Sequence, residues 1–413
     1  MIVTFLSNYI NHHQIPFCNA CYELWGEGFH FVQTRPMEQE RLSMGWSSQG
    51  QALPYVSCLY EQEEACRELV LESDVLLAGW SDQEKLVQQR LQEGRLTVRI
   101  SERLYREGQW KAISPKGLWH KYKEHIRFRN SPAYLLCAGA YVASDFHLIG
   151  AYPGKMFKWG YFTQLRTYSD GELALKKGKD GKVHIAWAAR FIPLKHPEYM
   201  IRLAKDLKEL AGRGRFGNTE FHLDLIGGGE LEPQIRELAD REQVSELCTF
   251  HGFQTPDKVR DLMEQSDIFL FTSNYLEGWG AVVNEAMNSG CAVVASLQAG
   301  AVPYLIEHGV NGLAYADGNY ESMKKQVCRL LADSSMRAEL GMAAYGTIHD
   351  LWNAEHAAKA LSDFLRARME NGETRICREG PLSIAPVLSM KKLNRELKRK
   401  EGGHRWKGQT DFH

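Results

Sequence analysis

One stretch, residues 267–319, limits the possible folds of this chain more than any other. It contains two short apolar runs, residues 268–271 and 292–295, each bounded by polar or turn residues. Runs of this kind are typical of buried parallel strands. Between them, a loop with two glycines leads into a helical pattern over residues 281–288. The order is therefore strand, glycine loop, helix and strand, and the free amides at the start of such a helix favour a phosphate group.

Two carboxylates frame this loop. Glu277 stands at its entry, and Glu285 follows inside the helix with seven residues between them. A carboxylate beside a phosphate is electrostatically unfavourable unless it has another task, such as accepting hydrogen bonds from hydroxyl groups. One acid over a sugar ring and one over a ribose would meet that need. Taken alone, Glu277 would be an ordinary loop acid and Glu285 a solvated helix residue.

The sequence of residues 277–296, EGWGAVVNEAMNSGCAVVAS, closely resembles the nucleotide-sugar site of retaining glycosyltransferases of family 4. The resemblance implies that Glu277, with the backbone of Gly278 and Trp279, binds the sugar hydroxyls, and that Glu285 binds the ribose. It also implies that backbone amides hold the diphosphate, and those amides belong to Gly280, Ala281 and Val282. With Trp279 near the sugar, we expect this residue to restrict the choice of donor.

A second match lies at residues 184–197, where an apolar strand pattern ends in Arg190 and a short turn carries Lys195. In family 4 an arginine and a lysine with this spacing hold the donor diphosphate, so the resemblance gives that role to Arg190 and Lys195. Two fixed cations at a strand end can neutralise a leaving diphosphate as it gains charge. An isolated pair of this kind would otherwise be a solvated surface pair.

Two weaker matches lie between these motifs. Residues 221–230 read as a strand that runs into a glycine turn, and we expect Gly228 to lie beside the donor. Residues 248–253 form the other match, and in the family this loop lies along the nucleobase. The resemblance therefore implies that backbone groups near Gly252 and Phe253 contact the base.

The loop after the first predicted strand faces the ligand side of an open α/β sheet. In the related transferases this loop usually holds a glycine pair and contacts the acceptor, but here the glycines are absent. The polar residues that stand instead are our candidates for acceptor contacts: Asn8, His12, His13 and Gln14. Solvated or helix-capping histidines are the open alternative for His12 and His13. The pattern NYINHHQIPF is similar to transferases of surface-polysaccharide assembly.

Another strand, residues 96–100, ends in a charged turn that contains Glu102, Arg103 and Arg106. Such a turn either faces the ligand or is an ion-paired surface turn. We include Arg103 among the candidate acceptor residues.

Two basic segments have alternative interpretations. Residues 118–129 are rich in cations and aromatic side chains, which fits either an ordinary solvated helix or contact with an anionic membrane or lipid-linked acceptor. Residues 391–400 carry six cations, which fits either a disordered tail or a membrane-adhesive one.

Composition sets the outer limits. A chain of 413 residues with 44% apolar residues suits two domains, and its net charge of -1 argues against bulk nucleic-acid binding. The nine cysteines include one close pair, Cys18 and Cys21, on a helical pattern, so we expect structural thiols in a reduced cytoplasmic setting. No stretch approaches the ~18 apolar residues that span a bilayer, and the first residues lack the basic leader of a signal peptide. We expect no metal and no cofactor, and the basic segments leave peripheral contact with the inner membrane face open.

The predicted fold class is α/β, in the GT-B arrangement that the resemblance implies. Two Rossmann-like doubly wound domains face each other across a cleft, and a C-terminal helix crosses back to the first domain. The predicted boundaries are an acceptor-side domain over 1–165, a linker over 166–181, a nucleotide-sugar domain over 182–350, a crossover helix over 351–370 and a flexible basic tail over 371–413.

The expected function is a retaining hexosyltransferase. It would move a sugar from a nucleoside diphosphate, with UDP as the expected carrier, to a hydroxyl of a glycan or lipid-linked acceptor. The residues expected to be catalytic are Arg190, Lys195 and Glu277. Two alternatives remain: a non-catalytic partner subunit with the same fold, and a nucleotide-sugar epimerase, which would need acid and base groups that the sequence does not display.

Overall fold

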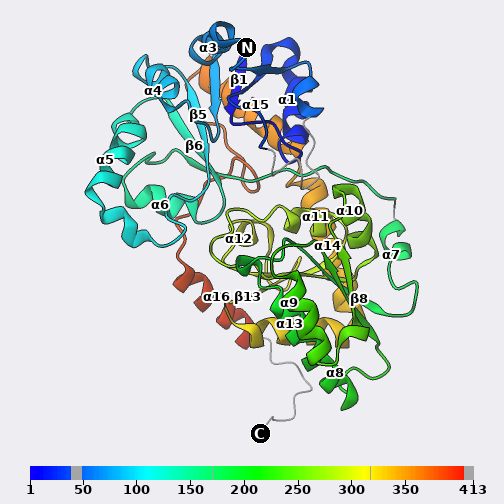
Figure 1. Cartoon of the computed structure of the whole chain (residues 1–413). Helices are drawn as coiled ribbons and strands as arrows, with labels where there is room; N and C mark the ends of the chain where they lie inside the picture. The colour runs from blue at the N-terminus through cyan, green and yellow to red at the C-terminus, as the bar shows by residue number, and fades with distance from the viewer. Residues whose placement is uncertain (39–48, 170, 317, 404–413) are drawn as a thin grey trace.

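The computed structural model describes residues 1–38, 49–169, 171–316 and 318–403. These form two α/β domains, drawn blue to cyan at the top of Figure 1 and green to yellow below. Each domain is built on one sheet in which every pair of neighbouring strands is parallel.

The first sheet has seven strands in the order β3-β2-β1-β4-β5-β6-β7. Its strands are β1 (Val3–Ser7), β2 (Phe29–Gln33), β3 (Val56–Cys58), β4 (Val75–Ala78), β5 (Thr97–Ser101), β6 (Ala133–Ala138) and β7 (Met156–Trp159). The order reverses between β1 and β4, as in a doubly wound fold, so that loops at the carboxyl ends of these strands face a ligand. The sequence analysis did not anticipate β2 or β3.

The second sheet repeats this pattern with six strands in the order β10-β9-β8-β11-β12-β13. Its strands are β8 (Val183–Ala188), β9 (Phe221–Ile226), β10 (Cys248–Gly252), β11 (Ile268–Phe271), β12 (Ala292–Ser296) and β13 (Leu313–Tyr315). All residues of β11 and β12 are buried, as the continuous apolar runs predict. The order reverses between β8 and β11, the two strands that precede the strongest motifs.

Helices connect the strands. Those of the first domain are α1 (Ile15–Trp25), α3 (Glu63–Glu72), α4 (Glu84–Gln92), α5 (Pro115–Glu124) and α6 (Val142–Leu148). Those of the second are α8 (Glu198–Gly212), α9 (Glu232–Arg241), α10 (Pro256–Gln265), α11 (Val282–Asn288), α12 (Val302–Leu305), α13 (Tyr320–Ala332) and α14 (Ser334–Asp350). Their sequences explain several starts: the side chains of Thr255, Asn319 and Asp333 accept backbone hydrogen bonds at the first turns of α10, α13 and α14.

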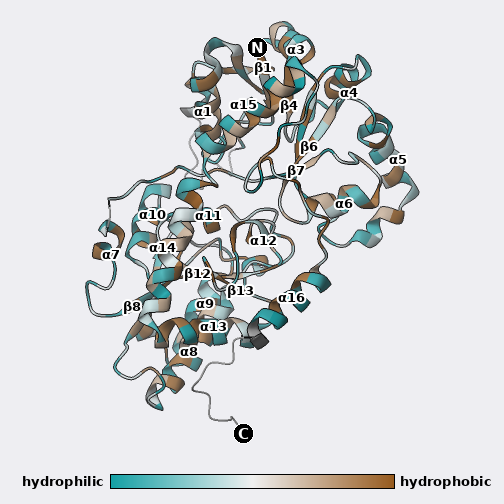
Figure 2. Ribbon diagram, turned by 180° about the vertical axis from the view of Figure 1, so that it is seen from behind, coloured by the Kyte–Doolittle hydropathy of each residue, from teal (hydrophilic) through white to brown (hydrophobic). Residues whose placement is uncertain are grey.

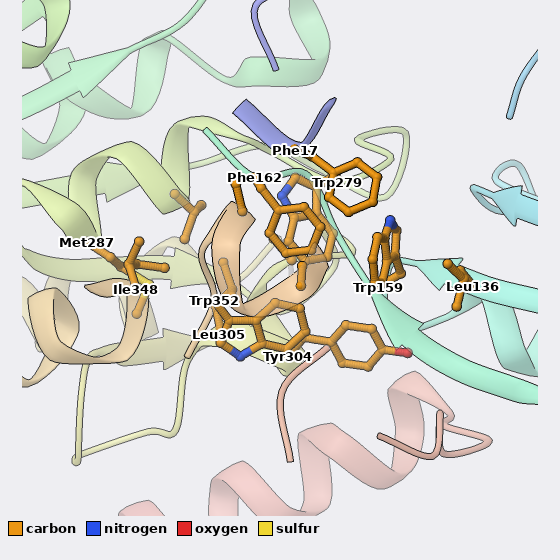
Figure 3. Packing of buried hydrophobic residues seen from close by; sticks show 14 of the residues in the cluster. Phe17, Leu136, Trp159, Phe162, Trp279, Met287, Tyr304, Leu305, Ile348 and Trp352 are labelled. Atoms are coloured by element: carbon orange, nitrogen blue, oxygen red, sulfur yellow. The ribbon is translucent and has the colours of Figure 1, made fainter. Parts of the chain in front are cut away.

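The long helix α15 (Ala354–Glu370) crosses back to the first domain and packs beside α1 (Figure 1). Asn353 caps its start, and the expected stripe of Trp352, Ala357, Leu361 and Phe364 is buried. Figure 3 shows the core at this crossing, where aromatic side chains of both domains meet in one hydrophobic cluster. The two domains therefore share a core as well as facing each other.

The segment predicted as a linker is bound tightly to the second domain. It contains a short helix, α7 (Glu172–Lys176), whose Leu173 is buried. Arg166 forms ion pairs with three carboxylates of α10: Asp257, Asp261 and Glu264. Because Glu264 is 4% exposed, the Arg166 guanidinium ties this segment to the domain interior. Asp170 lies outside the described residues.

The C-terminal segment differs from the flexible tail expected over 371–413. Leu382 and Ala385 are buried, and backbone hydrogen bonds join residues 382–385 to β7, with an antiparallel bridge between Phe157 and Ile384. Helix α16 (Met390–Gly403) follows and packs Leu397 against the protein. Alternating apolar residues before the basic run allow this pairing with the sheet edge. Residues 404–413 lie outside the described part of the chain.

The cysteines fit structural roles. All nine are free thiols, and Cys18 and Cys21 are completely buried on α1, where burial raises the pKa of both thiols. Within the described residues, no helix combines the length and the apolar character needed to cross a bilayer.

Candidate active site

The loop after β8 brings the two predicted diphosphate-binding cations to the carboxyl end of the second sheet. The side chain of Arg190 is exposed. Lys195 ends the short 3-10 helix η5 (Pro193–Lys195), and its side chain is 15% exposed. The difference in exposure leaves Arg190 accessible to a ligand, whereas Lys195 already has a protein partner.

That partner is Glu277, which forms a close ion pair with the Lys195 ammonium group. Glu277 lies in the loop after β11, and its side chain is 18% exposed. The sequence predicts both residues at the donor but not their pairing, because they lie 82 positions apart in the chain. The neighbouring strands β8 and β11 bring them together at the point where the strand order reverses.

Hydrogen bonds fix the loop after β8 relative to the loop after β11. The Thr272 hydroxyl donates to the Lys195 carbonyl and accepts from the Trp187 indole at 2.8 Å. The Asn274 amide donates to the Leu194 carbonyl at 3.0 Å. Thr272 and Trp187 are nearly inaccessible to solvent, so the position of the Lys195 backbone is set from beneath by buried groups.

The glycine turn after β9 allows a close approach between backbones. A Cβ on Gly227 would lie 2.1 Å from the Ala189 carbonyl oxygen, and Gly227 has a φ of +122°. The flexible backbone is therefore required where this turn passes the loop that carries Arg190. The Phe253 ring lies over Gly228, where an added Cβ would meet it at 2.8 Å. Phe253 is 62% exposed, and its flat ring after Gly252 offers a stacking surface beside the turn.

The loop between β11 and α11 also depends on a glycine. Gly280 has a φ of +94°, and a Cβ there would lie 2.6 Å from the Phe271 ring. Helix α11 then starts at Val282 after Ala281, with no side-chain cap. The first-turn amides therefore lack a capping side chain at the carboxyl end of β11.

Glu285 lies on α11 as predicted, in partly buried surroundings. Burial raises the pKa of its carboxyl group to about 7, against a smaller opposing effect of Arg260 and Arg166. Within the described residues, no hydrogen bond or ion pair to this carboxylate is present. A partly buried carboxyl group without a hydrogen-bond donor among the described residues is suited to bind hydroxyl groups of a ligand.

The indole of Trp279 is buried, whereas the sequence analysis expected this residue to lie near a sugar and restrict the choice of donor. It is 1% exposed, and its N–H donates to the Asn284 side chain at 2.9 Å. Its ring fills the space above Gly160 of the first domain and lies among Tyr304 and Trp352 (Figure 3). The whole residue, backbone included, is nearly inaccessible to solvent. The side chain instead anchors the loop between β11 and α11, residues 272–281, to the shared core; we call this segment the donor loop, after the ligand that the sequence predicts for it.

The first domain contributes a carboxylate, that of Glu102, which is not among the site residues expected from the sequence. Glu102 follows β5, pairs with Arg106 and accepts a hydrogen bond from the Tyr161 hydroxyl. A Cβ on Gly278 would lie 2.5 Å from the Glu102 carboxylate, so Glu102 touches the donor loop across the domain interface. Nearby Glu277 also helps raise the pKa of Tyr161, after the larger effect of burial. Glu102 belongs to the charged turn after β5, whereas the residue of that turn expected to contact an acceptor is its neighbour Arg103.

That neighbour, Arg103, points into its own domain and is not available as an acceptor contact. It forms an ion pair with Asp145 at 3.2 Å, and Asp145 is completely buried. The same carboxylate accepts from the Tyr105 amide at 3.1 Å and from the Gln109 side chain at 3.0 Å. Arg103 therefore neutralises a buried acid.

The polar loop after β1 is partly engaged in its own hydrogen bonds. The backbone N–H of Asn8 donates to the Trp80 carbonyl at 2.8 Å, and the side-chain amide of Gln14 donates to the Ser7 hydroxyl at 3.3 Å. Burial lowers the pKa of His12 to about 4, which keeps this imidazole neutral at physiological pH. His13 stacks parallel to Tyr161 at 6.3 Å, so the loop reaches the same interface as Glu102.

Gly139 of the first domain and Gly278 and Gly300 of the second domain lie together at the domain interface. A Cβ on Gly300 would lie 2.2 Å from the Gly278 carbonyl oxygen, and a Cβ on Gly139 would lie 3.2 Å from the same atom. The Ala140 amide of the first domain donates to the Gly300 carbonyl at 2.9 Å. The donor loop is therefore in direct backbone contact with the first domain.

Metal ligands are not grouped at this site. Among the residues that the structure describes, no cluster of three or more histidine, cysteine, aspartate or glutamate side chains could hold a metal ion. Lys195 and Arg190 are the cations present at the carboxyl ends of β8 and β11.

Two doubly wound domains, a crossover helix and a charged site at the switch point of the second sheet define the GT-B fold, the class predicted from the sequence. Solved structures agree. HepE from Anabaena in complex with UDP aligns with a TM-score of 0.65 at 15% identity, over 89% of this chain and all of that chain. The same protein in complex with UDP-glucose aligns with a TM-score of 0.62.

The sequence comparisons point to glycosyltransferases. Residues 173–347 match the family model described as glycosyl transferases group 1. The amylovoran biosynthesis glycosyltransferase AmsK of Erwinia amylovora is 27% identical over 150 residues, which are 35% of this chain and 37% of that protein. The lipopolysaccharide core biosynthesis glycosyltransferase LpsE of Rhizobium meliloti is 27% identical over 147 residues, 36% of this chain and 42% of its own length. The chain thus spans less than half the length of these relatives, and the family match covers mainly the second domain.

Proposed function

We propose that this protein is a retaining glycosyltransferase. It moves a hexose-type sugar from a nucleoside-diphosphate donor, a UDP-sugar, to a hydroxyl of a glycan or lipid-linked acceptor. The observation that carries the proposal is the Lys195–Glu277 ion pair beside the exposed Arg190, at the carboxyl ends of the switch-point strands.

This pair suits a site that exchanges partners when the donor binds. Without donor, Glu277 neutralises Lys195, so neither charge is left isolated at a partly buried position. When a diphosphate arrives beside Arg190, its greater negative charge attracts the Lys195 ammonium group. Glu277 is then released to accept hydrogen bonds from the sugar hydroxyls, and Glu285 does the same for the ribose.

The support for UDP as the carrier comes from the fold. HepE has been solved with UDP and with UDP-glucose. The exposed Phe253 ring over the glycine turn gives a uracil a surface on which to stack. The relatives' roles in amylovoran and lipopolysaccharide core biosynthesis support a glycan or lipid-linked acceptor.

The reaction is a substitution at the anomeric carbon. The bond from that carbon to the diphosphate oxygen breaks, and a bond to the acceptor oxygen forms on the same face, which retains the configuration. The departing phosphate oxygen takes the acceptor proton, so the protein needs no separate base. Arg190 and Lys195 stabilise the charge that develops on the diphosphate. The cations at this site make a metal ion and a cofactor unnecessary in the proposed mechanism.

The test is a panel of UDP-sugars and GDP-sugars with the purified full chain, measured by thermal shift and by release of nucleoside diphosphate. We expect one donor to raise the melting temperature and to be slowly hydrolysed. With that donor, Lys195→Ala should lower turnover by about 100-fold or more, the effect typical of losing one charge-stabilising group. Lys205→Ala is the matched control, since Lys205 also pairs with a glutamate but lies on the exposed side of α8. Near-normal turnover by folded Lys195→Ala protein would refute the diphosphate role.

The same panel examines a second candidate, a non-catalytic partner subunit. The support for this candidate is the polar loop after β1, which lacks the glycine pair expected of related transferases. A subunit of that kind would show no melting shift and no hydrolysis with any donor.

A further inference from the structure

The segment from η3 (Gln109–Ile113) through α5 exposes large apolar side chains to solvent. The exposed fractions are 83% for Ile113, 68% for Trp110 and 56% for Trp119, and Leu118 and Tyr122 exceed 40%. Single exposed apolar residues are normal on a protein surface, but a contiguous group marks an interaction site. Here five fall within thirteen consecutive positions.

The same segment is strongly basic. Residues 109–130 contain six lysines and arginines and one carboxylate, in a chain whose net charge is -1. Within the described residues, only Lys111 and Lys121 of these cations form ion pairs. Lys123 lies over the Trp119 ring at 4.8 Å, and Trp119 stacks on Tyr122 at 5.8 Å. Aromatic and cationic groups are therefore interleaved on one surface.

The fold holds this segment in place without covering it. None of the ten residues of α5 is buried. The anchor is the following turn, where His125 is buried, lies 2.9 Å from the Tyr152 hydroxyl and packs against Phe146. In Figures 1 and 2, α5 lies at the outer edge of the first domain, away from the second domain. A merely solvated helix would not direct tryptophan, leucine and tyrosine outward.

We propose that η3 and α5 form a docking surface for an anionic phospholipid bilayer. Tryptophan and tyrosine favour the interface between headgroups and acyl chains, because they combine an apolar ring with a polar group. The exposed side chains of Ile113 and Leu118 add apolar surface to the same segment, and the lysines are attracted to the anionic headgroups. This property is independent of the proposed transferase activity, because it involves none of the donor-site residues.

Helix α16 adds charge to the same side of the molecule. In Figures 1 and 2, α16 and α5 lie toward one side, and Figure 2 shows α16 as mostly hydrophilic. Its Leu397 is buried against the protein, whereas its lysines and arginines from 391 to 400 are exposed. We therefore propose that η3 and α5 insert into the headgroup region of the bilayer, whereas α16 contributes only electrostatic attraction to it.

The experiment is flotation of the purified full chain with vesicles of phosphatidylcholine, alone or with 30 mol% phosphatidylglycerol. Wild-type protein should float with the anionic vesicles and not with the neutral ones. Lys116→Gln combined with Lys123→Gln should weaken binding by about 30-fold, since each basic residue contributes about 1 kcal/mol near an anionic surface. Ile113→Ser combined with Trp119→Ser should weaken it by at least about tenfold through the loss of buried apolar area.

Leu175→Ser is the matched control. Leu175 is 79% exposed on α7 of the second domain, so its loss removes an exposed apolar side chain elsewhere and should leave flotation unchanged. Unchanged circular dichroism establishes that each variant is folded. The proposal is overturned if wild-type protein stays with the unbound fraction, or if both double variants float as well as wild type. It is also overturned if light scattering shows a dimer that Ile113→Ser with Trp119→Ser dissociates, because the surface would then serve self-association.

Discussion

The position of Trp279 gives the sharpest single test of this structure. If its indole anchors the donor loop to the shared core, substitution should act mainly on stability. If it lined the sugar site, substitution should act mainly on donor choice. Trp279→Phe separates these outcomes, because it keeps an aromatic ring and removes the N–H group.

The magnitude follows from the contacts. Trp279→Phe leaves the side-chain oxygen of Asn284 without its donor in a completely buried position, which costs about 1–3 kcal/mol. Trp279→Ala creates a cavity in addition, and loss of a buried aromatic side chain costs about 3–5 kcal/mol. We therefore expect a moderate loss of unfolding free energy for the phenylalanine variant and a larger one for the alanine variant.

Urea unfolding followed by circular dichroism measures these differences. Trp119→Phe is the matched control, since Trp119 is 56% exposed and its replacement should change the unfolding free energy by no more than about 0.5 kcal/mol. The reasoning would be refuted if Trp279→Phe were as stable as wild type and had altered relative kcat/KM values among donor sugars.

Two further predictions concern the donor loop and the helix after it. Burial raises the pKa of Glu285 to about 7 from an ordinary value of about 4.3, so the stabilising effect of its proton is complete below about pH 4.3 and lost as the pH rises through 7. The melting temperature of wild type should fall across that range relative to Glu285→Gln, and parallel pH profiles would contradict this. Gly278→Ala should weaken donor binding about tenfold, because its methyl group would meet the Glu102 carboxylate at 2.5 Å. Adding Glu102→Ala should restore most of the affinity in calorimetric titrations, and additive losses would exclude this contact as the cause.

The sequence predicted the second domain well because its strands and glycine turns leave local signals. The apolar runs at residues 268–271 and 292–295 are strands in the structure. β2 was missed: its sequence FHFVQ contains a histidine and a glutamine, and only the neighbouring strands show that four of its five residues are buried. In the first domain, burial comes from tertiary packing more than from a continuous apolar run.

The sequence indicated which residues belong to the candidate site, but it did not indicate which side chains they contact. The motifs located Arg190, Lys195, Glu277 and Glu285 on the expected elements, but their roles toward a donor stay predictions. The sequence did not predict which way a side chain beside the domain interface points, as Trp279 shows. Its indole is held by Asn284 on α11 and packs against Gly160 of the first domain and Trp352, contacts that form only in the folded chain.

The three glycines at the domain contact have a consequence for substitutions at the domain interface. With no β-carbons at Gly139, Gly278 and Gly300, the two lobes approach to backbone distance. A methyl group at Gly300 would lie 2.2 Å from the Gly278 carbonyl oxygen of its own domain and 3.0 Å from the Gly139 Cα of the first domain. A side chain at Gly300 would therefore change the spacing of the two domains and the position of the Gly278 backbone together, so the two cannot be altered separately at this position.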